Sequence, residues 1–146
     1  MKILELYSGA KTCKSVFKEF GCEIVSCSLD LFDVSIYPRA KFDIISINIH
    51  TNSLGEYYNE NDDGGLIVGL DLLEYYEPKY WIIQNNNKYI RDDICMWGIP
   101  FKDICTMRGG KLISTRVWTN IDKWRPKLYK IYIKQTYIIQ ELLQYI

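Results

Sequence analysis

The stretch that decides the fold is KILELYSGAKTCKSVFKEFGCEIVSCSLD, residues 2–30. Its first six residues form a short apolar run, typical of a buried strand, which a Ser-Gly pair ends. From Thr12 to Phe20, apolar side chains recur at helical spacing, and Gly21 stands where a glycine often closes a helix. Residues 23–27 are again strand-like. Strand, glycine turn, helix, strand and a closing aspartate predict a β-α-β unit of the nucleotide-binding type.

The remainder of the chain continues this alternation. In chain order, the sequence predicts a strand at 42–47, a helix at 65–76, a strand at 80–84, two strands at 104–107 and 111–120 around a Gly-Gly turn, and a terminal helix within 135–146. The expected fold class is therefore α/β: a mostly parallel sheet with helices on its faces and an antiparallel hairpin at one edge.

Size and charge narrow the class of protein. A chain of 146 residues makes one domain, and 48% hydrophobic residues can supply a normal core. Lysine plus arginine equals aspartate plus glutamate at 18 each, so the net charge is zero. Proteins that bind nucleic acid usually carry a basic surplus. We therefore expect DNA binding to be weak at most.

Cysteine and histidine content bears on metals and on the compartment. The five cysteines include no C-x-x-C pair, and His50 is the only histidine. We expect reduced thiols in an intracellular setting, cytoplasmic or nuclear, and no metal site. No apolar run approaches the about 18 residues that span a bilayer, so no membrane association is expected. The abundance of Ile, Lys, Asn and Tyr is typical of an AT-rich coding sequence, as in many viruses.

Five segments, in order along residues 1–120, carry a resemblance to a known family. They are LELYSG (Leu4–Gly9), Asp30, EPKYWIIQN (Glu77–Asn85), WGIPF (Trp97–Phe101) and TRVWTN (Thr115–Asn120). Together they resemble the catalytic domain of DNA cytosine-5 methyltransferases, particularly the compact forms of phages and large DNA viruses. The resemblance implies a Rossmann-like S-adenosylmethionine-dependent fold in a single domain, 1–146, in which residues 121–146 form a C-terminal extension. It also implies truncation before the target-recognition domain.

The resemblance assigns the cofactor site residue by residue. Tyr7, Ser8 and Gly9 match the turn that holds S-adenosylmethionine in the family, and Asp30 matches the acid that binds its ribose. Asp33 matches the acid of the segment beside the cofactor adenine. Lys11 replaces the second glycine of the first motif, where its side chain either crowds the pocket or lies on the surface. The Gly-Ala-Lys-Thr stretch is not a phosphate-binding P-loop, because the glycines of that motif are missing.

The catalytic positions depart from the family. The strand at 42–47 leads in the family to Ser-Pro-Pro-Cys, whose thiolate attacks cytosine; here Asn48, Ile49, His50 and Thr51 follow, and Thr51 takes the nucleophile position. A threonine hydroxyl is a much poorer nucleophile at neutral pH. Gln84 replaces the glutamate that binds the cytosine edge, and glutamine cannot give or take that proton.

Arg116 belongs to the segment that resembles the family's Arg-containing motif, and we regard it as a further candidate site residue. Lysines and arginines also gather between residues 123 and 134, a pattern more typical of a solvated face than of a phosphate track.

Three hypotheses follow for the function. The first is a catalytically inactive relative, kept for a binding, regulatory or structural role with a protein partner or a second copy, in a virus-encoded or virion-associated setting. The second is a protein that still binds S-adenosylmethionine, S-adenosylhomocysteine or another nucleotide. The third is an enzyme, either an active DNA methyltransferase or one with changed chemistry that uses His50.

Overall fold

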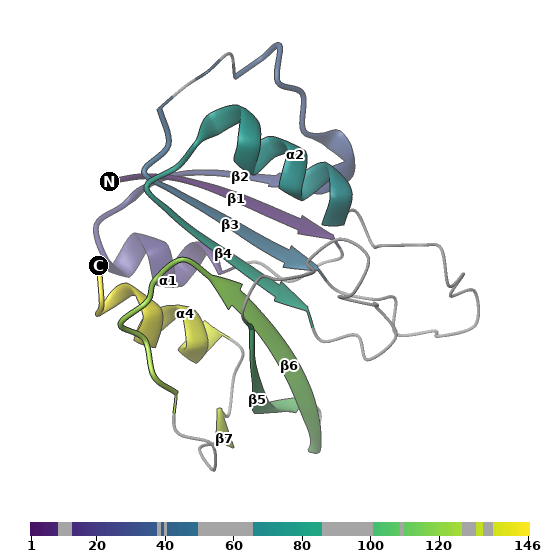
Figure 1. Ribbon diagram of the computed structural model, residues 1–146, viewed down its shortest axis with the longest axis vertical. Coiled ribbons are helices and arrows are strands. Elements are labelled where there is room, and N and C mark those ends of the chain that lie inside the picture. The colour runs from purple at the N-terminus through teal and green to yellow at the C-terminus, as the bar shows by residue number, and fades with distance from the viewer. Residues whose placement is uncertain are drawn as a thin grey trace, which may run out of the picture.

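The computed structural model describes residues 1–8, 13–37, 39, 41–49, 66–85, 101–108, 110–126, 131–132 and 136–146. In this part of the chain, one seven-stranded sheet runs in the order β2-β1-β3-β4-β6-β5-β7 (Figure 1). The strands are β1 (Lys2–Ser8), β2 (Glu23–Ser28), β3 (Ile44–Ile49), β4 (Tyr80–Asn85), β5 (Phe101–Arg108), β6 (Lys111–Thr119) and β7 (Ile131–Tyr132). The helices are α1 (Lys14–Glu19), the 3-10 turn η1 (Leu29–Leu31), α2 (Leu66–Tyr76) and α4 (Thr136–Leu143).

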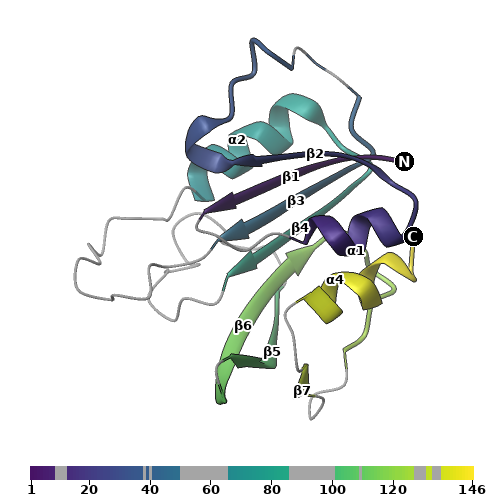
Figure 2. The same cartoon turned by 180° about the vertical axis from the view of Figure 1, so that it is seen from behind.

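The first four strands form a parallel, doubly wound unit. β1 pairs in parallel with both β2 and β3, and β3 pairs in parallel with β4. In the sheet, β2 therefore lies on one side of β1, and the next strand of the chain, β3, lies on the other side of β1. α1 lies on one face of the sheet and α2 on the opposite face, as Figures 1 and 2 show. The strand order thus reverses between β1 and β3, which is the topological switch point of a Rossmann-like sheet.

The hairpin adds the antiparallel part of the sheet. β6 pairs antiparallel with both β4 and β5, so the second strand of the hairpin lies between the parallel unit and the first strand. Gly110 lies in the turn with φ +77°, a conformation that glycine adopts without steric cost. The two residues of β7 pair with β5 at the outer edge. The predicted fold class, a mostly parallel Rossmann-like sheet with an antiparallel hairpin near one edge, is confirmed.

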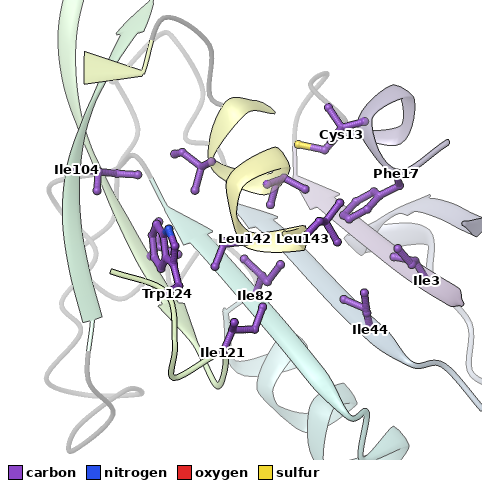
Figure 3. Close-up of a cluster of buried hydrophobic side chains, with 14 residues drawn as sticks. Ile3, Cys13, Phe17, Ile44, Ile82, Ile104, Ile121, Trp124, Leu142 and Leu143 are labelled. Carbon is purple, nitrogen blue, oxygen red and sulfur yellow. The ribbon is translucent and has the colours of Figure 1, made fainter. Parts of the chain in front are cut away.

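Two apolar clusters hold the sheet between its helices. One cluster joins strand residues such as Ile3, Ile44 and Ile82 to α1 and α4 (Figure 3). The other, on the α2 side, contains Leu4, Ile47 and their neighbours. All six residues of β3 are buried, which explains the unbroken isoleucine pattern that predicted it.

The helix ends follow ordinary capping rules. Gly21 follows the end of α1 with φ +72°, and its N–H donates to the carbonyl oxygen of Lys18. The predicted C-terminal glycine of this helix is therefore confirmed. At the end of α2, Glu77 adopts φ +46° immediately before Pro78, which prevents the helix from continuing. On the buried side of α2, a Cβ on Gly69 would come within 2.8 Å of Ile47 Cδ1, so glycine allows the helix to lie close to β3.

The bounds of two strands differ most from the sequence expectation: those of β3, and those of β5, which runs from Phe101 to Arg108 rather than over 104–107. The third strand runs from Ile44 to Ile49 rather than over 42–47, because it stays buried on both faces for two more residues. Asn48 is therefore part of the sheet and does not begin a loop. The C-terminal helix, α4, is confirmed, and four of its residues (Ile138, Ile139, Leu142 and Leu143) are buried in the cluster that contains Ile3.

Candidate ligand site at the carboxyl ends of the parallel strands

The candidate site lies where β1, β3 and β4 end. Strand pairing places Tyr7 beside Asn48 and Asn48 beside Gln84 in a single row across the sheet. One pleat earlier, Glu5 lies beside Ser46. Since directly paired residues share a face, and side chains alternate with a period of two, both rows lie on the face that α1 and α4 cover. This is the carboxyl end of the sheet at its switch point, where α/β proteins bind ligands.

Buried polar residues concentrate on this face. In the described part of the chain, the buried polar or charged side chains are Glu5, Ser46, Asn48, Gln84 and Thr115. Thr115 pairs with Ile104 of the α1/α4 cluster, so all five share one face. We call these five residues the polar row set. Burying a polar group is costly unless it is hydrogen-bonded, so five such residues on one face, with Asn48 and Gln84 near the carboxyl ends of β3 and β4, mark this face as a candidate site.

Glu5 anchors the entrance to α1. Its carboxylate is fully buried and accepts hydrogen bonds from the backbone N–H of Cys13 and from the Ser26 hydroxyl, the latter at 2.7 Å. Burial raises the pKa of Glu5, against the opposing effects of these two hydrogen bonds and of Lys14. The carboxylate thus fixes the residue before α1 to β1 and β2. The Glu5 carboxylate therefore connects β1, which precedes the predicted cofactor turn, to Cys13, which follows that turn.

The thiol beside Glu5 is not a substitute nucleophile. Cys13 is buried, and burial together with the nearby Glu5 carboxylate raises its pKa to about 12. The thiolate is the reactive form of cysteine, and at neutral pH this thiol stays protonated. Cys13 therefore belongs to the core and supplies no reactive thiolate.

Gln84 is the most unusual residue of the site. Its side chain is fully buried, yet neither the amide nitrogen nor the amide oxygen has a hydrogen-bond partner. Its row neighbour Asn48, by contrast, is engaged in an interaction. Leaving one buried polar group unsatisfied costs about 1–3 kcal/mol, and Gln84 leaves two. The only comparable group among the described residues is the indole N–H of Trp118, which lies on the other face.

Among the predicted cofactor residues, Tyr7 belongs to the row that contains Asn48, whereas Asp30 and Asp33 follow β2, on the far side of β1 from β3. Tyr7 and Ser8 are the last residues of β1, and Asp30 lies in η1 directly after β2. Asp33 follows on the surface, where its carboxylate accepts hydrogen bonds from the N–H and hydroxyl of Ser35 at 2.8 and 2.7 Å. These hydrogen bonds lower the pKa of Asp33. β1 and β2 therefore end side by side, with Asp30 directly after β2.

Arg116 is not brought together with the polar row set. It follows Thr115 on β6 and therefore faces the α2 side of the sheet. Its guanidinium pairs with the carboxylate of Asp103 at 2.7 and 2.9 Å, and lies 3.7 Å from the ring centroid of Phe101. A guanidinium committed to a carboxylate and a ring supports the hairpin rather than the site that contains Gln84.

Several predicted positions fall outside the described residues. These are Gly9, Lys11, His50 and Thr51. Within the described ranges, no group of three or more His, Cys, Asp or Glu side chains is placed to hold a metal ion. None of the described helices is long and apolar enough to cross a membrane.

Comparison with known proteins gives distant structural likenesses. No family model and no curated protein matches the sequence. Among solved structures, a triple mutant of Spodoptera frugiperda DNMT2 is 17% identical with a TM-score of 0.46, over 90% of this chain and 54% of that one. A METTL16 methyltransferase domain lacking its N-terminal part is 9% identical with a TM-score of 0.38, over 80% of this chain and 72% of that one. This chain thus spans about half of the DNMT2 chain, and the fold class rests on its own sheet order.

Proposed function

We propose that this chain is a methyltransferase-like protein that does not methylate cytosine and that acts by binding. The observation that carries the proposal is the fully buried, neutral side chain of Gln84. Attack on a cytosine ring requires a group that can share a proton with the ring, and an amide has no proton to share near neutral pH. Attack on cytosine also requires a strong nucleophile. Thr51, at the nucleophile position of the resemblance, has a hydroxyl that is a much poorer nucleophile than a cysteine thiolate.

A direct assay tests the loss of activity. Purified protein is incubated with DNA and S-adenosylmethionine carrying a labelled methyl group, beside an active cytosine-5 methyltransferase as positive control. We expect no label in DNA above that found with heat-denatured protein. Label on cytosine, lost in Gln84→Met, would overturn the proposal. Label transferred to another substrate, and lost in His50→Ala, would instead favour changed chemistry.

The ligand that we propose for binding is S-adenosylmethionine or S-adenosylhomocysteine. Support comes from the switch point between β1 and β3, and from the anchoring of α1 to β1 and β2 through Glu5. Burial of the Glu5 carboxylate costs free energy. Such a cost is expected where the residues around a ligand must keep a defined geometry. Asp30 and Asp33 are the proposed partners of the ribose and the adenine segment.

Thermal unfolding with ligand tests this part of the proposal. A ligand that binds only the folded state stabilises it by about 2.7 kcal/mol at one hundred times Kd, so the midpoint should rise with concentration. Asp33→Asn should reduce the rise, whereas Asp122→Asn, at another exposed aspartate after the end of β6, should not. No rise at millimolar concentrations of either ligand would refute retained cofactor binding.

A protein partner or a second copy of the chain is the other proposed form of binding. The segment after β2 exposes large apolar side chains, with Leu31 at 78% and Ile36 at 66% exposure. Light scattering after size-exclusion chromatography, over a range of concentrations, measures self-association. If the wild type self-associates through this segment, Leu31→Ser combined with Ile36→Ser should shift it toward the monomer. A mass unaffected by that double change would exclude the segment as the contact.

A further inference from the structure

The two edges of the sheet are protected to different degrees. In the described part of the chain, one edge ends in β7, which has two residues, and the other ends in the six residues of β2, which pair with β1 alone (Figure 1). Natural sheets blunt their edges with short strands, lysines, prolines or bulges. The sequence of β2 is EIVSCS, its pairing with β1 is unbroken, and its only charged residue is Glu23 at the first position. β2 is therefore an edge strand without these protective features.

Alternate residues of β2 direct their backbone groups away from the sheet. The N–H of Glu23 donates to the carbonyl oxygen of Met1 at 2.9 Å, so the backbone groups of Glu23 face β1. In a strand, the N–H and C=O of one residue point to the same side, and those of the next residue point to the other side. The backbone groups of Ile24, Ser26 and Ser28 therefore point outward, where no other described strand pairs with them.

The described segment between η1 and β3 does not pair with this edge either. Its aromatic side chains pack toward α2: Phe32 stacks on Tyr37, and the Tyr76 hydroxyl of α2 donates a hydrogen bond to the carbonyl oxygen of Tyr37. None of the described residues of this segment makes a backbone hydrogen bond to β2. Among the described residues, the outward groups of β2 thus have no partner strand, which is the arrangement that an added strand uses.

We propose that β2 pairs antiparallel with β2 of a second copy of this chain across a two-fold axis, so that the two sheets join into one. The register centred on Ser26 is the one that pairs all three outward residues: Ser26 with its own copy, and Ile24 with Ser28. A two-fold axis gives both copies the same hydrogen bonds, so donors and acceptors balance. This inference deepens the second-copy form of the proposed binding function and rests on it.

Charge and apolar surface favour a second copy as the partner. In this register the two Glu23 residues lie at opposite ends of the paired strands, so like charges do not face each other. The same register brings η1 of one copy, which contains Leu31, near the turn that follows Phe20 in the other. Leu31 and Phe20 are 78% and 40% exposed, so exposed apolar residues meet at both ends of the strand pair.

The size of the edge sets the expected strength of association. Six strand residues span about 20 Å. An edge of this length and one sheet thick offers less than the about 800 Å² per partner that a standard stable interface buries. We therefore expect a dimer that forms reversibly as the protein concentration rises from micromolar to millimolar.

The first experiment removes one edge donor without disturbing the monomer. Ser28 has φ −61°, close to the value that proline requires, and its side chain makes no capping hydrogen bond. Ser28→Pro therefore fits the monomer but lacks the outward N–H, and Ser28→Ala is the matched control that keeps it. Sedimentation velocity over a range of concentrations measures association, and thermal unfolding verifies that both variants are folded.

The wild type and Ser28→Ala should dimerise equally, and Ser28→Pro should dimerise about tenfold more weakly or less, because two hydrogen bonds of the symmetric pair are lost. Equal association of all three proteins overturns the proposal. A wild type that stays monomeric at millimolar concentration also overturns it.

The second experiment tests the register without proline. Centring the pair on Ser26 places residue 25 of one copy opposite Cys27 of the other, in a non-hydrogen-bonded pair whose Cα atoms are about 4.5 Å apart, within disulfide range. Val25→Cys should therefore give a covalent dimer on a non-reducing gel after mild oxidation, and Val25→Cys with Cys27→Ser should not. Val68→Cys, at a 51% exposed position on α2, controls for random collision.

Three outcomes of the second experiment overturn the proposed pairing. They are absence of a covalent dimer of Val25→Cys, a covalent dimer of the variant that also carries Cys27→Ser, and equal cross-linking of Val68→Cys.

The combined change of Leu31→Ser and Ile36→Ser, measured in the same way, separates this inference from the proposal on which it rests. Association that is lost in that variant and unchanged in Ser28→Pro overturns pairing through β2 but keeps the segment after β2 as the contact between copies. The response to S-adenosylmethionine, measured in the same samples, shows separately whether the proposed cofactor binding holds.

Discussion

The two faces of the sheet use the same strands in different ways. On the α2 face, β1 and β3 present apolar side chains as far as their carboxyl ends: Leu4, Leu6, Ile45, Ile47 and Ile49. On the α1/α4 face, the same strands begin with Ile3 and Ile44 and then change to Glu5, Ser46 and Asn48. The alternation of side chains lets one face remain core while the other becomes a site. Adjacent residues of β1 and β3 therefore lie in different environments, apolar on the α2 face and polar on the α1/α4 face.

The largest expected effect tests the apolar face. Ile47→Ala should lower the free energy of unfolding by about 2–5 kcal/mol, because Ile47 is fully buried beneath α2 and the cavity cannot close completely. Urea denaturation measures this change. Binding of ligands on the other face should persist at temperatures where the variant is folded. A loss of binding that is larger than the loss of folded protein would break the separation of the two faces.

Glu5→Gln tests the polar face, with a dependence on pH as its signature. A carboxyl whose pKa is raised on folding contributes stability that is present below its unfolded pKa, near 4.5, and lost as the pH rises through the folded pKa. The wild type should therefore lose stability relative to Glu5→Gln as the pH rises above about 4.5. At low pH the variant should be less stable by about 1–3 kcal/mol, because the amide nitrogen cannot accept a hydrogen bond.

Chemical denaturation of both proteins between pH 4 and pH 8 measures this difference. A gap that stays constant over the range would show that Glu5 does not titrate abnormally. Ser26→Ala is a useful companion, since it removes only one of the two described donors to the carboxylate.

Gly21→Ala tests how firmly α1 covers the polar face. Nothing lies within 4 Å of the position of an added Cβ, so crowding is absent and only the left-handed backbone matters. We expect a loss of about 1–2 kcal/mol, measured by thermal or urea unfolding. Gly21→Asn, which tolerates this conformation better, should lose less. Equal stability of the alanine variant and the wild type would mean that the turn rearranges.

The smallest effect is expected at the pair formed by Arg116 and Asp103. Both side chains are substantially exposed, so Asp103→Asn should cost about 0.2–1 kcal/mol and less at high salt. It should leave the rise of the unfolding midpoint with S-adenosylmethionine unchanged, since the pair belongs to the hairpin of β5 and β6 and not to β1 or β2. A strong effect on ligand binding would mean that Arg116 contributes to the site, and would contradict the separation of the two faces of the sheet.

The sequence was sufficient for the parts of the fold that are locally encoded. The β1-α1-β2 unit, the glycine after α1 and the hairpin follow from periodicity and from turn residues, which act over a few neighbours. The end of β3 was misplaced because Asn48 is a polar residue buried in a strand, and polarity alone suggested a loop. β7 has only two residues, which are too few to show the alternation of side chains that predicts a strand.

The composition of the site required tertiary information. Gln84 was identified through the resemblance, but its burial and its missing partners depend on the strands on both sides. The side of the sheet that Arg116 faces follows from the register between β4 and β6, which the sequence does not display. Glu5 is not among the site residues that the resemblance assigns, although a single acid inside the apolar run of residues 3–6 is a visible signal, because a charge buried in a strand is costly unless it is paired or hydrogen-bonded.

The position of α4 has a consequence for biosynthesis. Ile138, Ile139, Leu142 and Leu143 complete the cluster that contains Ile3 and Phe17, and the Trp124 indole donates a hydrogen bond to Glu141 of the same helix at 3.2 Å. β1 is synthesised before α4, so the apolar side chains of β1 on this face stay partly uncovered until α4 is available. On the ribosome, the α2 face can form its core before the α1/α4 face. The nascent chain should therefore expose the apolar side chains of the α1/α4 face to chaperones until synthesis reaches α4.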